Sequence, residues 1–508
     1  MPRPHVSQIT APHPFSWRSA YFRSITALAV VVLAVRLVWG WHVRRLLDAQ
    51  FDEIRRRGEP VEVAELKFED VPQERNAWTL QTRAAQAQAT GVDSPKNGNL
   101  EYPNYPPFPA EWRQMAEASE RVNAPVFSLA RQARQYAGVQ IHAVPLTSPM
   151  YATLLPYLNT MRQLANTLAD GAIYAQVRGD DAEAVERAAD LFHLARSVHH
   201  DEFLVSQLVA IGIEAVACNT AQILAPGLRF APGGSTTRPA DRARVRALLG
   251  RVLDDRDAWQ GLRHNLVVER LGVIDSDRWQ ATGTWFIQPL ADLDILRNNR
   301  NFEIAMRAAM ATNAPQAQAT LAAMSERPLL MRPWSGRLPA GLPRYSRWFH
   351  LAGENFSHYF DAYFRMIAER RATAVSLAAQ LFRADHRRWP NRLDELVPEY
   401  LPAVPIDPFH DDGRPLGYVI LQTPGAPGVQ RPMMYFDAGD VTDPVIRDEP
   451  MYEWRNDSRR GKMNRRVRQY RDLSRFVPPP VADATQPATL PAANPATAPS
   501  PHAVDYHP

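Results

Sequence analysis

A long apolar run near the N-terminus indicates that part of this chain folds in a membrane. The run extends from Ile25 to Trp41 and contains one charged residue, Arg36. A bilayer core is crossed by roughly 20 helical residues at about 1.5 Å each, so the run is just long enough. We predict a transmembrane helix over residues 25–41, with the lipid bilayer as its partner; the alternative is a buried helix of a soluble protein. Arg36 is expected to reach the interface beside Trp39 and Trp41.

The flanks of this run predict an uncleaved anchor. Cleavage by a signal peptidase needs small residues after the apolar core, whereas this chain continues with arginine, tryptophan and histidine. Arginines lie on both sides of the run, so their distribution does not decide the orientation. A short N-terminal segment favours insertion with residues 1–24 in the cytoplasm. We expect a single-pass protein of the bacterial inner membrane with most of its chain in the periplasm.

Length and composition point to a folded, multi-unit body. The chain has 508 residues, which favours two or three folding units, and 45% hydrophobic against 22% charged residues excludes full disorder. Its single cysteine, Cys218, excludes an intrachain disulfide framework and a thiolate-rich metal site. The formal charge is +4, but residues 451–475 hold nine basic and three acidic residues, so the remainder carries about 4 − 6 = −2. The basicity belongs to one segment.

Apolar periodicity divides the body into helical regions. Residues 42–110 are predicted to form a helical stalk followed by a linker, because a helix pattern runs to Arg57 and a proline-rich stretch comes later. Residues 111–230 show apolar residues at three- and four-residue steps, as in a helical bundle, with a capped turn at Gly179-Asp180-Asp181. A second helical region is expected over 240–326, and a proline-rich linker over 327–343.

The C-terminal part has a different pattern. From Phe356 an aromatic stripe at helical spacing predicts a long helix whose aromatic side chains form a core. A short helix, a proline-pinned turn and two strands near Leu416–Ile420 and Met433–Phe436 should follow as an antiparallel hairpin packed on that helix. We therefore predict a mainly α protein: a transmembrane helix, a helical-bundle body, a small α+β module over 356–445 with a β-hairpin, and a disordered tail.

This module resembles the globular part of the type II secretion major pseudopilins. The resemblance rests on Trp389-Pro390, the Leu393–Val397 run, Tyr400-Leu401 and Asp407-Pro408-Phe409, and it covers about 70 of the 508 residues. It implies the fold of the module and an envelope setting. The chain departs from the family before its apolar run, where no glutamate precedes Glu53, so it is not a processed pilin subunit.

The same resemblance implies a calcium site in the terminal loop. In the family, calcium is often held there by aspartates, and Asp437, Asp440 and Asp443 occupy the corresponding place in this chain. Carboxylate oxygens are the ligands that calcium prefers. Calcium is thus the one cofactor that the sequence suggests, and a solvated acidic turn is the alternative.

The last two segments of the chain, 451–475 and 477–508, differ in composition from the rest. Within 451–475 aromatic residues alternate with arginines, a pattern that could bind anionic lipid, nucleic acid or an acidic partner, while a solvated, partly helical surface is the commoner outcome. The candidate anion-binding residues are Arg459, Arg460, Arg465, Arg466 and Arg468. Residues 477–508 contain nine prolines and eight alanines and should be disordered.

No strong catalytic motif occurs in the chain. A phosphate-binding loop, a nucleophile elbow, a zinc-protease helix and a dinucleotide fingerprint are all missing from the sequence. The densest group of polar candidates is His193, His199, His200, Asp201 and Glu202, which we interpret as a polar loop between helices. We expect an envelope protein with a scaffolding or protein-interaction role. Alternatives are an enzyme with a site inside the helical body, and a cytoplasm-facing protein whose residues 451–475 bind nucleic acid or anionic lipid.

Overall fold

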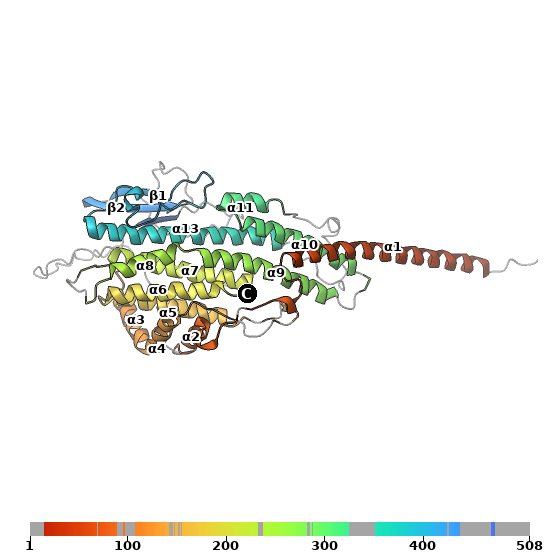
Figure 1. The fold of residues 1–508 in the computed structure, drawn as a ribbon, viewed down its shortest axis with the longest axis horizontal. Coiled ribbons are helices and arrows are strands. Elements are labelled where there is room, and N and C mark those ends of the chain that lie inside the picture. Colours follow the sequence, from red (N-terminus) through yellow and green to blue (C-terminus); the bar gives the residue numbers. More distant parts are fainter. Residues whose placement is uncertain are drawn as a thin grey trace, which may run out of the picture.

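The computed structural model describes residues 15–68, 70–88, 95–96, 107–141, 146, 148–150, 153, 155–231, 237–281, 285–286, 288–324, 351–423, 426–436 and 469–472. Within these ranges the chain is mostly helical, with a small antiparallel sheet on one side (Figure 1). The linker expected over 327–343 and the tail expected over 477–508 lie outside the described residues.

The helices are α1 (Phe15–Arg56), α2 (Ala77–Gln86), α3 (Ala110–Val122), α4 (Ala124–Ala133), α5 (Tyr157–Val177), α6 (Asp181–His199), α7 (Leu204–Leu224), α8 (Arg242–Leu253), α9 (Arg256–Ala281), α10 (Gln288–Ala308), α11 (Ala314–Leu321) and α13 (Leu351–His386). The strands are β1 (Gly417–Thr423), β2 (Ala426–Phe436) and β3 (Gln469–Asp472). Short 3₁₀ turns cover Val63–Glu65, Gln73–Arg75, Ala225–Gly227 and Leu393–Leu396.

Two described helices are long and apolar enough to cross a membrane. They are the Tyr21–Arg56 part of α1, whose most apolar window is 6% buried, and Leu204–Gly227, which contains α7 and whose window is 61% buried. Because α7 packs between α5, α6, α9 and α13, its apolar composition is explained by the core of the body. The first half of α1 has no such cover and projects from the body (Figure 1).

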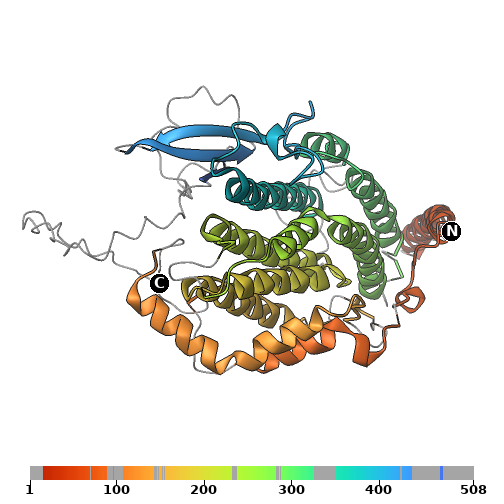
Figure 2. The same cartoon turned by 60° about the vertical axis from the view of Figure 1, so that its left-hand side comes forward.

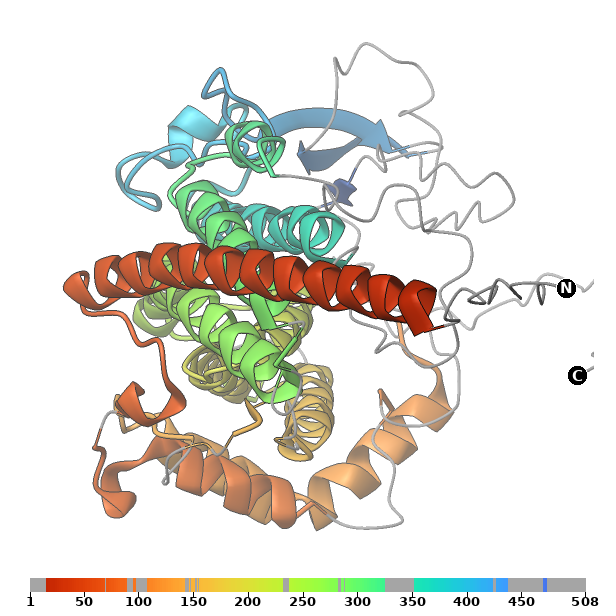
Figure 3. The same ribbon diagram turned by 90° about the vertical axis from the view of Figure 1, so that its right-hand side faces the viewer.

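The second half of α1 differs from the expected stalk. Leu47, Phe51 and Ile54 are buried with Ile274 of α9 and Ile295 of α10, so this half is part of the folded body. Figure 3 shows α1 lying across α9 and α10. One continuous helix thus carries an exposed apolar half and a packed half.

The bundle at the centre of the body confirms the periodicity prediction. Short connections join α5, α6 and α7, so successive helices run in opposite directions and bury their alanine- and leucine-rich faces together. The predicted cap is present, since the Asp180 side chain accepts a hydrogen bond from the Glu183 backbone at 3.0 Å. Gly179 has φ +90, which permits the tight turn before that cap.

The long helix α13 connects the bundle to the sheet. Its aromatic residues Phe356, Phe360 and Phe364 are buried against α10 and α11, as predicted, and its later turns pack on α7 and α8. Figure 2 shows the sheet on the outer side of α13, opposite the bundle. The fold is therefore layered, with helices on one side of α13 and the sheet on the other.

The predicted hairpin is also present. Strand β1 pairs antiparallel with β2, with Val419 opposite Met433, and Met434 and Phe436 are buried in the core that α13 shares with the sheet. Strand β3 pairs with the other edge of β2. Strand β3 comprises Gln469–Asp472, so this part of the basic segment, for which a partly helical surface was the commoner expectation, forms a strand.

Candidate functional site

The polar residues at the α6–α7 junction do not converge on a common point. His199 is buried, with Nδ1 2.6 Å from Oε1 of Gln207, whereas His200 faces Asp257 of α9 at 3.5 Å. Asp201 accepts a hydrogen bond from the Tyr157 hydroxyl at 2.7 Å.

Hydrogen bonds at this junction connect α5 and α9 to the start of α7. Glu202 pairs with His264 of α9, and Asn265 donates to the backbone oxygens of Asp201 and Phe203 at 2.8 and 2.7 Å. His199 and Asp201 are almost fully buried and His200 and Glu202 partly so, which makes the expected polar loop a connection between α5, α7 and α9. His193 is also buried, on α6. In the part of the chain that the structure describes, no group of three or more His, Cys, Asp or Glu side chains could hold a metal ion.

A cleft lined by arginines lies elsewhere, between α4, α6 and α8. Its volume is 270 Å³, and its charged lining residues are Arg131 and Arg134 of α4, Glu186 of α6, and Arg244 and Arg251 of α8. Arg134 follows directly on the last residue of α4. Four of these lining side chains are guanidinium groups and one is a carboxylate, although buried carboxylates beneath the lining offset part of the positive charge. Guanidinium groups bind carboxylates and phosphates through paired hydrogen bonds.

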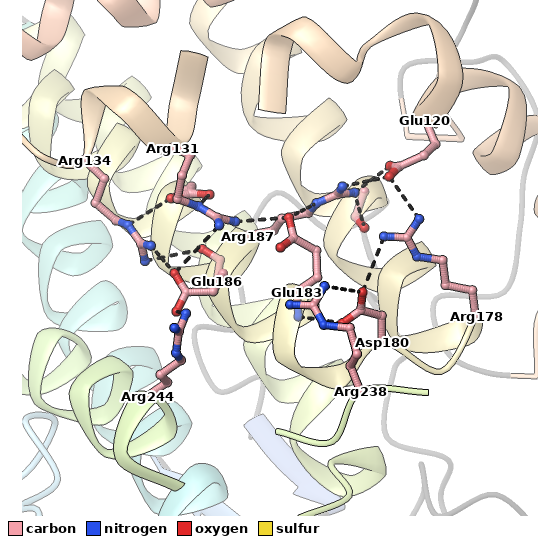
Figure 4. A network of polar contacts seen from close by, with 12 residues as sticks. Glu120, Arg131, Arg134, Arg178, Asp180, Glu183, Glu186, Arg187, Arg238 and Arg244 are labelled. Carbon is pink, nitrogen blue, oxygen red and sulfur yellow. Dashed lines mark hydrogen bonds and ion pairs between the residues drawn. The ribbon is translucent and has the colours of Figure 1, made fainter. Parts of the chain in front are cut away.

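Buried carboxylates beneath the cleft hold two of these arginines in place. Asp190, whose side chain is 1% exposed, lies 2.8 Å from Nε of Arg131 and 2.9 Å from Nε of Arg134. Glu186 bridges Arg134 and Arg244, and thereby joins α8 to the cleft (Figure 4). The positions of these guanidinium groups are set before any ligand arrives, which lowers the entropy cost of binding.

The same network continues along α6 to a second group of ion pairs. Glu183 accepts hydrogen bonds from both Arg131 and Arg187, at 3.1 and 2.9 Å. Arg187 is buried, binds both oxygens of Glu120 at 2.5 and 2.7 Å, and stacks on the Phe127 ring at 4.0 Å. Figure 4 shows how these residues join α3, α4 and α6. This half is saturated by internal partners and serves packing.

Burial has the largest effect on the pKa values in and beside the cleft. Burial raises the pKa of Asp190 to about 6 despite the opposing effect of Arg134 and Arg131. Burial, with Arg134 as the next cause, lowers the pKa of the Arg251 guanidinium, and burial near Arg196 and Arg251 lowers the pKa of His193 to about 4. Among the described residues, Arg251 has no ion-pair partner within 4.0 Å. It is the lining arginine with the most freedom to bind an added anion.

Sequence reasoning missed this cleft because its residues come from three distant segments. A signal was present: Glu183, Glu186 and Asp190 are spaced by three and four residues, which places three carboxylates on one face of α6. Arg131 and Arg134 repeat the three-residue step on α4. Because the chain contains 55 arginines, two of them three residues apart are not a distinctive signal.

The sites that the sequence did predict cannot be placed. The proposed calcium ligands Asp437, Asp440 and Asp443 lie outside the described residues, as do the anion-binding candidates Arg459, Arg460, Arg465, Arg466 and Arg468. Arg36 is described, and its environment differs from the expected one. Its side chain is 8% exposed and bonds to the backbone of Trp285 and Phe286, instead of reaching the interface beside Trp39 and Trp41.

Comparison with known proteins gives no relative from which a role could be carried over. A scan against protein-family models returned no match, and searches of curated proteins and of solved structures found no significant similarity. The function has to be argued from the two features described above: the divided helix α1 and the arginine cleft.

Proposed function

We propose that this protein is a single-pass membrane protein of the bacterial envelope that binds another envelope protein. The observation that carries the membrane part is the division of α1. Its first half exposes side chains such as Leu28, Val31 and Val35, whereas its second half buries Leu47 and Ile54 in the body. Exposing so large an apolar surface to water is unfavourable, and a bilayer removes that cost.

Membrane extraction tests this proposal. After an alkaline carbonate wash, the full-length protein should remain in the membrane pellet, since a spanning helix is released only by detergent. A variant without residues 1–34 should move to the supernatant and keep its helical circular dichroism, because residues 21–34 of α1 are exposed and do not pack on the body. Release of the full-length protein by carbonate alone would contradict the proposal.

The arginine cleft is the surface that we assign to the partner. Its lining contains four arginines, one of them without an ion-pair partner among the described residues, and two others are fixed from below by Asp190. Such a surface suits glutamate- or aspartate-rich segments, whose carboxylates can replace water around the guanidinium groups. The role is thus protein interaction, as the sequence suggested, with an acidic partner segment.

A matched pair of variants tests the cleft. Replacing Arg251→Gln removes a lining charge, whereas Arg256→Gln removes an equal charge from a side chain that is 79% exposed and pairs with Asp254. We expect Arg251→Gln to weaken binding of a fluorescent decaglutamate peptide about tenfold, the loss of one charge-assisted contact, and Arg256→Gln to weaken it less than about twofold. Fluorescence anisotropy on the detergent-solubilised protein measures both. Equal losses would assign the binding to general surface charge.

Two further parts of the proposal concern the orientation of the protein in the membrane and the character of its C-terminal module. We propose that the body lies in the periplasm, where the cleft would face other envelope proteins. We also propose that the module after α13 is pseudopilin-like, which would link the protein to secretion. The long helix followed by an antiparallel hairpin supports this, since it is the order of elements that the resemblance implies.

A further inference from the structure

The turn between α9 and α10 carries an unusual set of exposed apolar side chains. Trp279, Trp285 and Phe286 are 51%, 54% and 58% exposed, and Leu290 at the start of α10 is also exposed. Among the described residues outside α1, the other aromatic side chain that is exposed is that of Trp259, at 37%, and it lies at the opposite end of α9. We call Trp279, Trp285, Phe286 and Leu290 the aromatic tip.

The aromatic tip is fixed to the apolar half of α1. The Arg36 guanidinium stacks on the Trp285 ring at 4.8 Å, and its Nε donates to the Phe286 carbonyl at 2.7 Å. One turn later, Gly40 leaves room for the Arg36 guanidinium, because a Cβ at that position would overlap it, and the same Cβ would lie 3.3 Å from Pro289 at the start of α10. The tip therefore sits beside a defined level of α1.

That level lies within the segment proposed to cross the bilayer. Arg36 precedes Trp41, the last residue of the apolar run, by five residues, which is about 7.5 Å along a helix. On the other side of α1, Val38 near this level and Trp41 at the end of the apolar run are exposed. Amphipathic elements that rest on membranes bury their apolar face to a depth of about 5–10 Å, and tryptophan favours this zone. The height of the tip matches that depth.

Two acidic residues near the tip have partners within the body. Asp292 is buried and lies 3.8 Å from Arg44 of α1, and Asp277 accepts a hydrogen bond from Asn298 at 3.3 Å. Burial raises the pKa of Asp277 to about 7, so this carboxyl carries a reduced charge near neutral pH. The acidic side chains do not offset the apolar character of the exposed tip.

We infer that the aromatic tip is a second membrane contact, inserted into the interface of the same bilayer that α1 spans. The inference rests on the proposed function, since it requires α1 to be in the membrane. With one spanning helix alone, α1 and the body packed on it could still tilt and rotate together in the bilayer. A second contact beside Arg36 fixes the body against the membrane surface and thereby sets the direction in which the arginine cleft faces.

Site-directed spin labelling tests this contact in the full-length protein. The native Cys218 is buried, and burial raises the pKa of its thiol, so it resists labelling. Single cysteines are introduced as Phe286→Cys at the tip, Val31→Cys on α1 and Met310→Cys after α10, all at exposed positions, with Leu290→Cys as a second tip position. Each labelled protein is reconstituted into phosphatidylcholine–phosphatidylglycerol vesicles, and collisions with oxygen and with a water-soluble nickel chelate are measured.

The expected ratio of oxygen to nickel collisions is highest at residue 31, intermediate at residues 286 and 290, and lowest at residue 310. A tip as accessible to nickel as residue 310, with residue 31 still deep, would overturn the second contact while leaving the anchor intact. Shielding of the tip from both reagents would also overturn it, because it would show a protein contact there. Nickel access at residue 31 would refute the anchor itself and the tip with it.

Discussion

Replacing Arg370→Met should lower the free energy of unfolding by about 3–5 kcal/mol. The Arg370 guanidinium lies 2.5 Å from Oε1 of Glu214, and both side chains are buried between α7 and α13. Arg370 also donates to the backbone oxygens of Val252 and Asp254, at 2.9 and 2.5 Å, where α8 ends. Removing it leaves a buried carboxylate without its counter-ion and the end of α8 without these donors.

Three further variants, Arg371→Met, Glu214→Leu and the double variant Arg370→Met with Glu214→Leu, separate the ion pair from general disruption. Arg371→Met alters the next residue, whose guanidinium donates to the Ile406 carbonyl at the surface, and should cost less than about 1.5 kcal/mol. The double variant Arg370→Met with Glu214→Leu should lose less than the two single changes together, because the unpaired charge is gone. Urea unfolding followed by circular dichroism measures all four. Strict additivity would show that the pair contributes no coupling.

Replacing Leu47→Ala should lower the free energy of unfolding by about 2–5 kcal/mol, whereas Leu46→Ala should change it by less than about 0.5 kcal/mol. Leu47 is fully buried in the cluster that joins α1 to α9 and α10, and its neighbour Leu46 is 48% exposed. Both changes delete the same atoms from adjacent positions of one helix. The same unfolding measurement decides between them.

The comparison of these two variants tests whether the second half of α1 belongs to the body. Equal small effects would mean that this half is a free stalk, as the sequence alone suggested. A large effect at Leu47 alone would support the packed arrangement, in which movement of the membrane helix is transmitted directly to the body.

Local signals accounted for the parts of the fold that were predicted correctly. The spacing of apolar residues indicated α5, α6 and α7, the Asp180 cap marked the start of α6, and the aromatic stripe indicated the buried face of α13. Each of these depends on residues within a few turns of one another, where periodicity and capping chemistry act.

Contacts between distant segments could not be predicted in this way. The sequence suggested that Arg36 reaches the membrane interface. Its actual partners, Trp285 and Phe286, lie about 250 positions away, and no residue near Arg36 in the sequence indicates that contact. The stalk interpretation failed for the same reason, since the apolar face of residues 46–54 does not reveal whether it packs on lipid, on another chain or on α10. The arginine cleft is formed by residues of α4, α6 and α8, which come together only in the folded protein.

The most direct test of the central claim is the topology of the full-length protein in the bacterial cell. Two reporters are fused separately after Pro508, one active only outside the cytoplasmic membrane and one active only inside, with intact expression verified for both. We predict activity of the outside reporter alone, because α1 should cross the membrane once and leave the body in the periplasm. Activity of the inside reporter alone would contradict the envelope role and would place the cleft and the basic segment 451–475 among cytoplasmic partners.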